Sequence, residues 1–161
     1  MEINTVAVVG CGLMGSGIAE IAAKSGYTTL VREVDDELLE KGLGRIRKSM
    51  DRAVEKGKLE AGDRDAALDR LRGVTALEDL AGADLVIEAI VEDLDAKKEL
   101  FSTLDELCPE HTILASNTSS LTITEMAAAT DRPDRFVGLH FFNPVPVMKL
   151  VEVVRTIATG E

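Results

Sequence analysis

Short runs of apolar and β-branched residues alternate along the chain with longer amphipathic stretches. Apolar residues at successive positions predict strands that are buried on both faces, as in a parallel sheet. These runs predict strands over residues 5–9, 27–31, 84–89, 111–115, 135–141 and 148–154. The stretches between them predict helices over residues 13–24, about 36–58, 62–71, 93–107 and 122–129. Strands that alternate with helices imply right-handed crossovers and a mainly parallel sheet with flanking helices, so the expected fold class is α/β.

The length of the chain fits a single domain. Its 161 residues, 45% of them hydrophobic, suffice for one buried core, and the sequence has no internal repeat, low-complexity tract or long linker. We therefore expect one domain over residues 1–161, with a helical arm at about 36–71.

Charge and composition argue against several classes of protein. Asp and Glu outnumber Lys and Arg by 29 to 18, giving a formal net charge of −11, so we expect neither nucleic acid nor a membrane surface as a partner. Aromatic residues make up 3%, without Trp, so stacking platforms for single strands are missing. Cys11 and Cys108 cannot make a disulfide framework, and no Cys/His cluster predicts a metal. A cytoplasmic location fits best.

The uncharged stretch over residues 3–19 is not expected to be a signal peptide or a membrane span. Four glycines interrupt it, and the only charge that precedes it is acidic, at Glu2. A signal peptide has a basic start, and a span needs more apolar residues.

Residues Gly10–Gly15 fit the pattern G-x-G-x-x-G between a predicted strand and a predicted helix. In that context Gly10 permits the tight turn, Gly12 lets a pyrophosphate approach the backbone, and Gly15 lets helix and strand pack closely. The helix N-terminus supplies N–H groups for the phosphates. A plain glycine turn is the alternative interpretation.

Glu33 follows the second predicted strand, 23 residues after Gly10. An acid near that spacing binds the adenosine ribose hydroxyls and repels a 2′-phosphate, so it favours NAD over NADP. The neighbouring Arg32 argues in the other direction, because an arginine at this place can bind the 2′-phosphate of NADP. The alternative for Glu33 is a solvated loop charge.

The segment 41–58 holds seven basic residues and two acids in an otherwise acidic chain. Its helical spacing places several of the basic residues on one face, namely Arg45, Lys48, Arg52 and Lys56. A solvated helix face and a cradle for a polyanionic, phosphate-bearing ligand explain this pattern equally well.

Two polar segments follow predicted strands, at the carboxyl edge where α/β sheets bind ligands. Residues 116–120 read Ser-Asn-Thr-Ser-Ser, and His140 ends another strand. Glu152 is a carboxylate in an otherwise apolar strand, and a buried carboxylate needs a partner, so we expect it to pair with His140 and orient the imidazole. The alternatives are a core histidine and a Glu152 that points to solvent from an edge strand.

Taken together, these motifs resemble the N-terminal NAD-binding domain of the L-3-hydroxyacyl-CoA dehydrogenases, including 3-hydroxybutyryl-CoA dehydrogenases. The resemblance covers nearly the whole chain and rests on four segments in the family's order, residues 12–15, 88–92, 116–120 and 140–149. The last two are the most specific. Other NAD-dependent 3-hydroxyacid dehydrogenases, which use a lysine base, lack them.

The resemblance implies a role for particular residues. His140 would be the general base and Glu152 its orienting partner, while Ser119 and Asn143 would hold the substrate oxygen. Ser49 and Lys56 on the arm, with Ser119, would contact the coenzyme A substrate. The residues implied to bind NAD are Gly10, Cys11, Gly12, Leu13, Met14, Gly15, Glu33, Glu92, Lys97, Ser119 and Asn143.

The resemblance also implies what the chain does. The expected activity is reversible, NAD-dependent oxidation of the 3-hydroxyl of an L-3-hydroxyacyl-CoA to the 3-oxoacyl-CoA, as in fatty acid or butanoate metabolism. Glu33 departs from the commoner Asp, which would alter affinity rather than cofactor choice.

Family members continue into a helical C-terminal domain that completes the acyl pocket and forms a homodimer. This sequence stops at Glu161, so we expect that domain to be absent. An NAD-binding module without turnover is therefore an alternative, and a dehydrogenase for another anionic hydroxy acid is a third reading.

Overall fold

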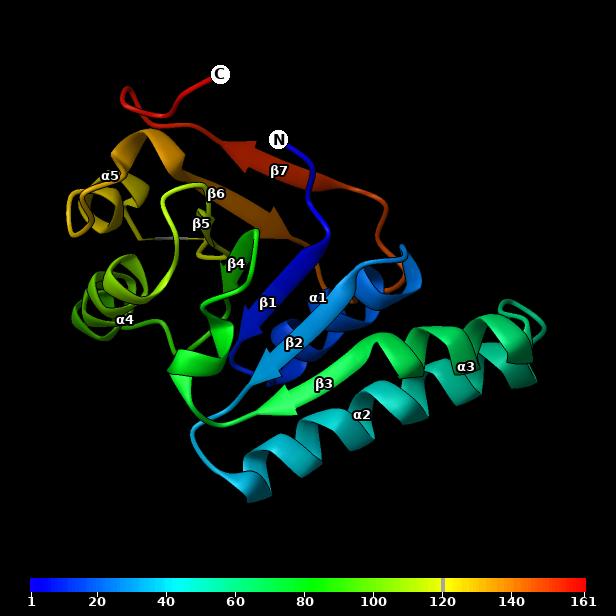
Figure 1. Ribbon diagram of the computed structural model, residues 1–161. Coiled ribbons are helices and arrows are strands. Elements are labelled where there is room, and N and C mark those ends of the chain that lie inside the picture. Colours follow the sequence, from blue (N-terminus) through cyan, green and yellow to red (C-terminus); the bar gives the residue numbers. More distant parts are fainter. Residues whose placement is uncertain (120) are drawn as a thin grey trace.

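One sheet of seven strands runs through the computed structural model, which describes residues 1–119 and 121–161 (Figure 1). Ser120, the last residue of the predicted Ser-Asn-Thr-Ser-Ser motif, lies outside the described residues. The strand order is β3-β2-β1-β4-β5-β6-β7, and all neighbours are parallel except β6 and β7. The predicted α/β class and mainly parallel sheet are therefore confirmed. The strands are β1 (Thr5–Val9), β2 (Thr28–Arg32), β3 (Leu71–Val74), β4 (Leu85–Glu88), β5 (Ile113–Ser116), β6 (Phe136–Phe141) and β7 (Val151–Val154).

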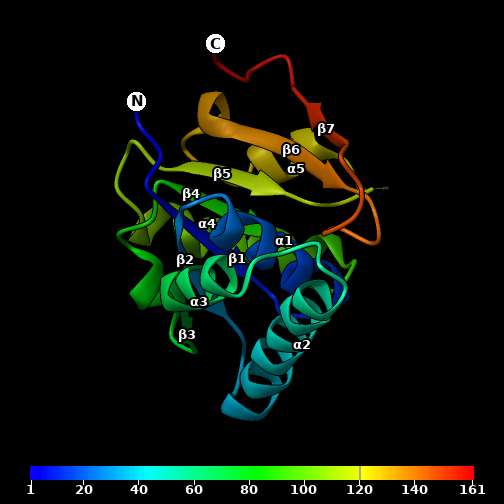
Figure 2. The ribbon, with the colours of Figure 1, turned by 90° about the vertical axis from the view of Figure 1, so that its right-hand side faces the viewer.

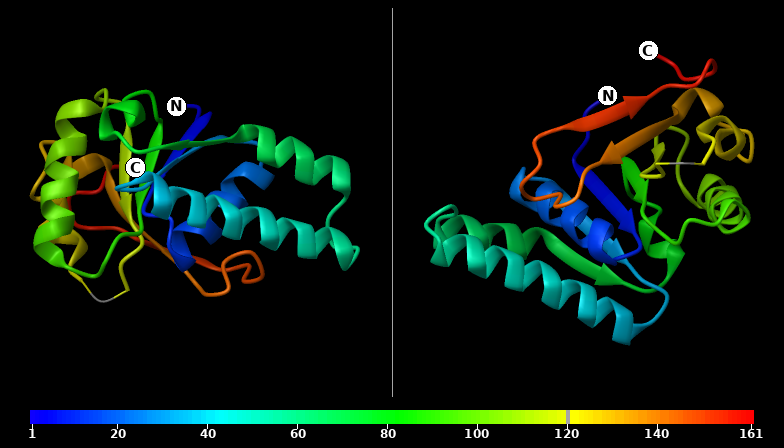
Figure 3. Two further views of the ribbon diagram at one scale, coloured as in Figure 1. Left: turned by 90° about the horizontal axis from the view of Figure 1, so that it is seen from below. Right: turned by 180° about the vertical axis from the view of Figure 1, so that it is seen from behind.

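Helices cover both faces of the sheet (Figure 3). Helices α1, α2 and α3 pack with one apolar cluster, and α4 and α5 pack with the other. The helices are α1 (Leu13–Lys24), α2 (Asp36–Glu55), α3 (Ala61–Arg70), α4 (Leu94–Leu107) and α5 (Ile123–Ala127), with 3₁₀ turns at Leu77–Leu80 and Pro133–Arg135. Over the described ranges, no helix combines the length and apolar character that crossing a membrane requires.

Strand β1 explains why the apolar runs show no alternation. Val6 and Val8 belong to the cluster under α1, whereas Ala7 and Val9 belong to the cluster under α4. All four residues are at most 3% exposed. A strand covered on both faces needs apolar side chains at every position.

Helices α2 and α3 lie side by side and extend beyond the sheet (Figures 1 and 2). The Asp35 carboxylate caps α2 by accepting the N–H of Leu38 at 2.8 Å. Leu39, Ile46 and Met50 bury one side of α2, while its basic residues lie on the other faces. This helical pair occupies the range predicted for the arm.

One strand was not predicted, and the start of another was placed three residues too early. Strand β3 was missed, because its Leu-Arg-Gly-Val sequence holds a charge and a glycine and resembles the end of the preceding helix. The last strand begins at Val151 rather than at Met148, since the N–H groups of Val147 and Met148 both bind the Pro144 carbonyl in a turn.

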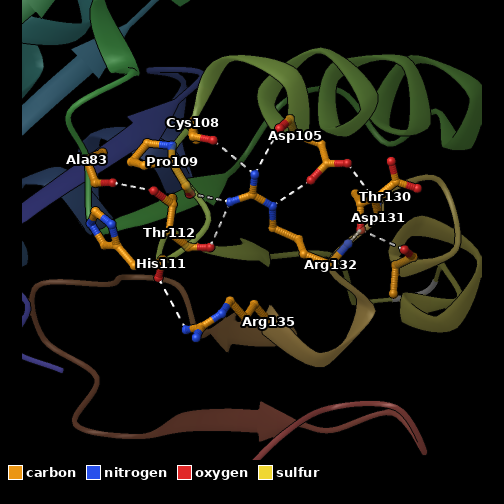
Figure 4. Close-up of polar contacts among 11 residues, drawn as sticks. Ala83, Asp105, Cys108, Pro109, His111, Thr112, Thr130, Asp131, Arg132 and Arg135 are labelled. Carbon is orange, nitrogen blue, oxygen red and sulfur yellow. Dashed lines mark hydrogen bonds and ion pairs between the residues drawn. The ribbon is translucent and has the colours of Figure 1, made fainter.

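Arg132 fixes the connection between α4, β5 and the segment before β6 (Figure 4). Its guanidinium pairs with the Asp105 carboxylate and donates to the carbonyls of Asp105, Cys108, Pro109 and Thr112. Two of these carbonyls belong to the C-terminal end of α4, where a cation also interacts favourably with the helix dipole. The side chain therefore provides donors for four carbonyls, of which those of Cys108 and Thr112 are bound in buried contacts.

Candidate functional site

The carboxyl ends of β1, β4, β5 and β6 meet at one edge of the sheet and enclose a pocket of about 350 Å³. The chain reverses its strand order between β1 and β4, which is where open α/β sheets bind their ligands. The lining residues include most of the predicted nicotinamide-side and catalytic residues. They are Met14, Ala89, Ile90, Glu92, Lys97, Asn117, Ser119, His140, Phe141, Phe142 and Asn143.

The loop between β1 and α1 has the geometry predicted for a phosphate-binding turn. Gly10 has a φ of +93°, which favours glycine, and a Cβ at Gly15 would lie 1.8 Å from the Gly10 carbonyl oxygen. A Cβ at Gly12 would meet nothing within 4 Å, and no side chain caps α1. Open space therefore faces the first N–H groups of the helix, and this cradle fits the pyrophosphate of a dinucleotide.

Glu33 lies beside the same loop, as the spacing predicted. Its Oε2 accepts the Cys11 N–H and its Oε1 accepts the Val34 N–H, each at 3.0 Å. The carboxylate is thereby held at the end of β2, in the place of an acid that binds ribose hydroxyls. Arg32 donates its Nε to the Thr75 carbonyl at 2.9 Å, which ties this arginine to the residue after β3.

The Cys11 side chain is not available to a cofactor. It is 2% exposed and packs under α2, where a Cβ at Gly42 would lie 2.2 Å from its Sγ. Burial, together with the charge of Glu33, raises the pKa of the Cys11 thiol to about 11. The thiol therefore stays neutral and buried. Cys11 was predicted to bind the cofactor, and only its backbone atoms are placed to do so.

A buried ion pair lies behind the pocket. Lys97 is 2% exposed and binds Glu88, which is fully buried, with Nζ–O distances of 2.6 and 2.9 Å. Glu88 also accepts the Ser116 hydroxyl at 2.6 Å and the Ile90 N–H at 2.8 Å. Every oxygen of the Glu88 carboxylate is thus bound, as a buried charge requires.

Lys97 also holds Glu92 at the mouth of the pocket. Its Nζ lies 3.0 Å from Glu92 Oε1, and the Thr118 hydroxyl donates to the same carboxylate at 2.8 Å. Burial raises the pKa of Glu92, but the hydrogen bonds from Thr118 and Lys97 outweigh it and keep that pKa below its usual value. Two residues predicted for the cofactor site therefore act as one charged network.

Asn117 connects the ends of β5 and β6. Its Oδ1 accepts the Phe141 N–H at 2.9 Å, which fixes the backbone directly after His140. Ser119 is exposed in the same pocket, and Asn143 lies at its other side. The three residues that were predicted to act at the substrate hydroxyl, namely Ser119, His140 and Asn143, thus line one pocket.

His140 and Glu152 face each other across β6 and β7, but two details differ from the prediction. They are directly opposed in the antiparallel register, with His140 Nδ1 3.9 Å from Glu152 Oε1. That distance is short enough for an ion pair but longer than a hydrogen bond. The Glu152 side chain is 59% exposed rather than buried, because β7 is the edge of the sheet. His140 is 24% exposed, and its ring packs on Phe142 at a centroid distance of 4.5 Å.

A larger groove of about 760 Å³ begins beside this pocket and runs along α2. Asn143 lines both spaces, so they adjoin. Ser49 and the four basic residues predicted to share a helix face all line the groove. Its basic lining residues are Lys24, Lys41, Arg45, Lys48, Arg52, Lys56 and Lys58.

Sequence reasoning missed three residues of these sites. Glu88 and Asn117 lay in the selected segments 88–92 and 116–120 but were given no role of their own, and Glu20 was not selected. Glu88 is an acid in an apolar strand, the same signal that drew attention to Glu152. The strand positions explain the difference, since β4 is central and β7 is at the edge. Asn117 and Glu20 carried no comparable signal.

Comparisons with known proteins identify the family. The profile of the family described as "3-hydroxyacyl-CoA dehydrogenase, NAD binding domain" matches residues 5–161. A 3-hydroxybutyryl-CoA dehydrogenase of Mycobacterium tuberculosis is 51% identical over 160 residues, which are 99% of this chain and 56% of that protein. The human mitochondrial hydroxyacyl-coenzyme A dehydrogenase is 48% identical over 165 residues, which cover 99% of this chain and 52% of that protein.

Solved structures agree with this result. The structure of (S)-3-hydroxybutyryl-CoA dehydrogenase PaaH1 from Ralstonia eutropha superposes with a TM-score of 0.97 at 44% identity, covering 99% of this chain and 56% of that one. The chain thus spans about half the length of the curated relatives that it matches. The chain belongs to the 3-hydroxyacyl-CoA dehydrogenase family and corresponds to the NAD-binding domain of that family.

Proposed function

We propose that this chain carries the cofactor site and the general base of a dehydrogenase that oxidises the 3-hydroxyl group of an L-3-hydroxyacyl-CoA. One observation carries the proposal: the pocket around His140 adjoins a groove lined by seven basic side chains, with Asn143 in both. A hydroxyacyl group in the pocket and a phosphorylated carrier in the groove match the two ends of this substrate.

In this proposal His140 takes the proton from the substrate hydroxyl. An imidazole can both accept and return a proton, which suits a base that works in both directions of a reversible reaction. The Glu152 carboxylate, 3.9 Å from Nδ1, stabilises the imidazolium that forms and leaves Nε2 to meet the substrate. Ser119 and Asn143, from the segments after β5 and β6, hold the substrate oxygen so that its proton faces the ring.

The glycine loop and Glu33 fit NAD. The open space at Gly12 receives the pyrophosphate, and the Glu33 carboxylate binds the ribose hydroxyls and repels a 2′-phosphate. The glycine loop and Glu33 would hold NAD, which would supply the acceptor for the hydride from C3 of the substrate. Lys97 and Glu92, fixed by the buried Glu88, orient the nicotinamide half of the site.

The basic groove binds coenzyme A in this proposal. Ser49 and Lys56 line it along with the cations that share their helix face. Arg45 also donates to the Cys11 carbonyl at 3.1 Å, so the groove is tied to the glycine loop. The two ligands would therefore lie on adjoining parts of one surface.

A second candidate is an NAD-binding module without turnover of its own. This candidate is favoured because the chain covers only part of the length of its relatives, for example 56% of the M. tuberculosis protein. In that case hydride transfer needs residues that lie outside this sequence.

The formation of NADH from NAD and L-3-hydroxybutyryl-CoA tests the proposal. Wild type should form NADH, and His140→Gln should lower kcat/KM by about 10²–10⁴-fold, the usual contribution of a general base. Thr156→Ala, at a threonine outside both sites, is the control and should retain the wild-type rate. Turnover that is unaffected by His140→Gln would reject the base. NAD binding with no turnover until a helical C-terminal domain is added would favour the second candidate.

A further inference from the structure

Glu20 is a buried carboxyl group that the proposed reaction does not use. It lies on α1 and is 1% exposed. Within residues 1–119 and 121–161, its Oε2 is the one buried side-chain nitrogen or oxygen atom without a hydrogen-bond partner. Buried polar groups are normally satisfied, so a carboxyl oxygen without a partner calls for a specific explanation.

The position of Glu20 in the basic groove supplies that explanation. Among the described residues that line the groove, Glu20 is the only acid, and it shares this lining with the cations of α2. The Ser49 hydroxyl of α2 and the Lys24 ammonium of α1 both face it closely enough to lower its pKa. The remaining basic lining residues are Lys41, Arg45, Lys48, Arg52, Lys56 and Lys58.

The other elements around Glu20 bring no further charge toward it. Helix α3 packs on α1 but contributes no residue to the groove lining, and its Arg70 donates to the Ala23 carbonyl at 2.9 Å. The segment 143–147 lies against the same part of α1, where a Cβ at Gly17 would be 2.7 Å from Val145 Cβ, and it holds no ionisable side chain. In the part of the chain that the structure describes, no histidine lines the groove.

The surroundings of Glu20 act on its charge in opposite directions. Burial raises the pKa of Glu20, while Ser49 and Lys24 offset part of that rise. As a carboxylate, Glu20 cancels one of the groove's positive charges. As a neutral acid, Glu20 costs less to bury and leaves the full positive potential to the ligand.

We propose that Glu20 sets the affinity of the groove for its polyanionic ligand, weakening binding while ionised and gaining a proton when the ligand binds. The inference rests on the proposed function, because it takes the phosphates of an acyl-CoA as the polyanion. Its basis is the juxtaposition of one buried acid, with an unsatisfied oxygen, and a groove otherwise lined by cations and uncharged residues.

Titration calorimetry with coenzyme A tests this role. At pH about 7, Glu20→Gln should bind coenzyme A about threefold to tenfold more tightly than wild type, since the variant lacks a buried negative charge in a groove otherwise lined by cations and uncharged residues. The matched control is Glu55→Gln, which removes an exposed charge of α2 outside the groove lining and should change affinity little. NAD affinity should be equal in all three proteins, which also reports that each is folded.

A second measurement detects the proton. Calorimetry in two buffers with different ionisation enthalpies gives the protons taken up on binding, and wild type should take up more than Glu20→Gln. The titration of the substrate's own phosphates cancels in this difference. In unaltered protein, the ¹³C resonance of the Glu20 carboxyl should titrate at a higher pH when coenzyme A is saturating.

The outcomes separate this inference from the proposed function. If wild type binds coenzyme A but Glu20→Gln binds it equally and takes up equal numbers of protons, Glu20 has no such role and the acyl-CoA function stands. If Glu20→Gln and Glu55→Gln raise the affinity for coenzyme A equally, the change in net charge alone explains the effect, and the inference is overturned. If wild type binds no coenzyme A, the proposed function and this inference both fail.

Discussion

Replacement of Lys97 by methionine should lower the free energy of unfolding by about 3–5 kcal/mol, the range for removing one partner of a buried ion pair. The change deletes two Nζ contacts with Glu88, at 2.6 and 2.9 Å, and leaves its carboxylate in a site that is 0% exposed. Ser116 and the Ile90 N–H still bind Glu88 in the variant, so we expect the lower end of the range.

Urea denaturation followed by circular dichroism measures this loss. For a chain of 161 residues, about 3 kcal/mol corresponds to a fall in Tm of roughly 6–12 °C. Lys98→Met removes a less buried lysine from the same helix and should change stability by less than about 0.5 kcal/mol.

A double variant shows whether the isolated charge causes the loss. Glu88→Gln combined with Lys97→Met removes both charges, so it should be more stable than Lys97→Met alone. A loss below about 1 kcal/mol in Lys97→Met, or no recovery in the double variant, would refute our account of this ion pair.

Three further predictions address cofactor choice, the groove and acid stability. Glu33→Ala should narrow the preference for NAD over NADP, because the variant lacks both the ribose contact and the repulsion of the 2′-phosphate; equal Kd values for the two cofactors in wild type would contradict this. Lys56→Glu should weaken acyl-CoA binding by about 1–3 kcal/mol and leave NAD binding unchanged. An unaltered Kd for acyl-CoA would instead indicate that this helix face is solvated and binds no ligand. Hydrogen bonds from the N–H groups of Asn4 and Thr5 hold the pKa of Asp84 below its usual 3.8. This carboxylate therefore stabilises the fold above about pH 3.8, and the contribution is lost as pH falls through the folded pKa. Asp84→Asn should remove that part of the acid dependence, and identical unfolding curves across the acid range would argue against it.

The core of the fold could be predicted because its strongest elements carry their own signals. β1 and α1 begin and end as predicted, since an unbroken apolar run and a glycine turn mark both boundaries. β3 could not be predicted in this way. Its two central residues, Arg72 and Gly73, have low strand propensity, and pairing with β2 determines its conformation.

In the candidate site, too, some features could be predicted from the sequence and others could not. Spacing along the chain predicted that Glu33 would lie at the glycine loop, and a carboxylate in an apolar strand predicted that Glu152 would face His140. The burial of each carboxylate depends on the position of its strand within the sheet. Glu88 on central β4 is enclosed, whereas Glu152 on edge strand β7 is exposed, and a single sequence gives no strand order.

A crystal structure of the chain with NAD and a 3-hydroxyacyl-CoA tests the central claim most directly. The account predicts the pyrophosphate at Gly12, the coenzyme A phosphates in the groove beside Lys56, and the substrate 3-hydroxyl within hydrogen-bond distance of His140 Nε2. The same structure would contradict the account if the acyl chain lay outside the pocket between Ser119 and Asn143, with no substrate oxygen near His140.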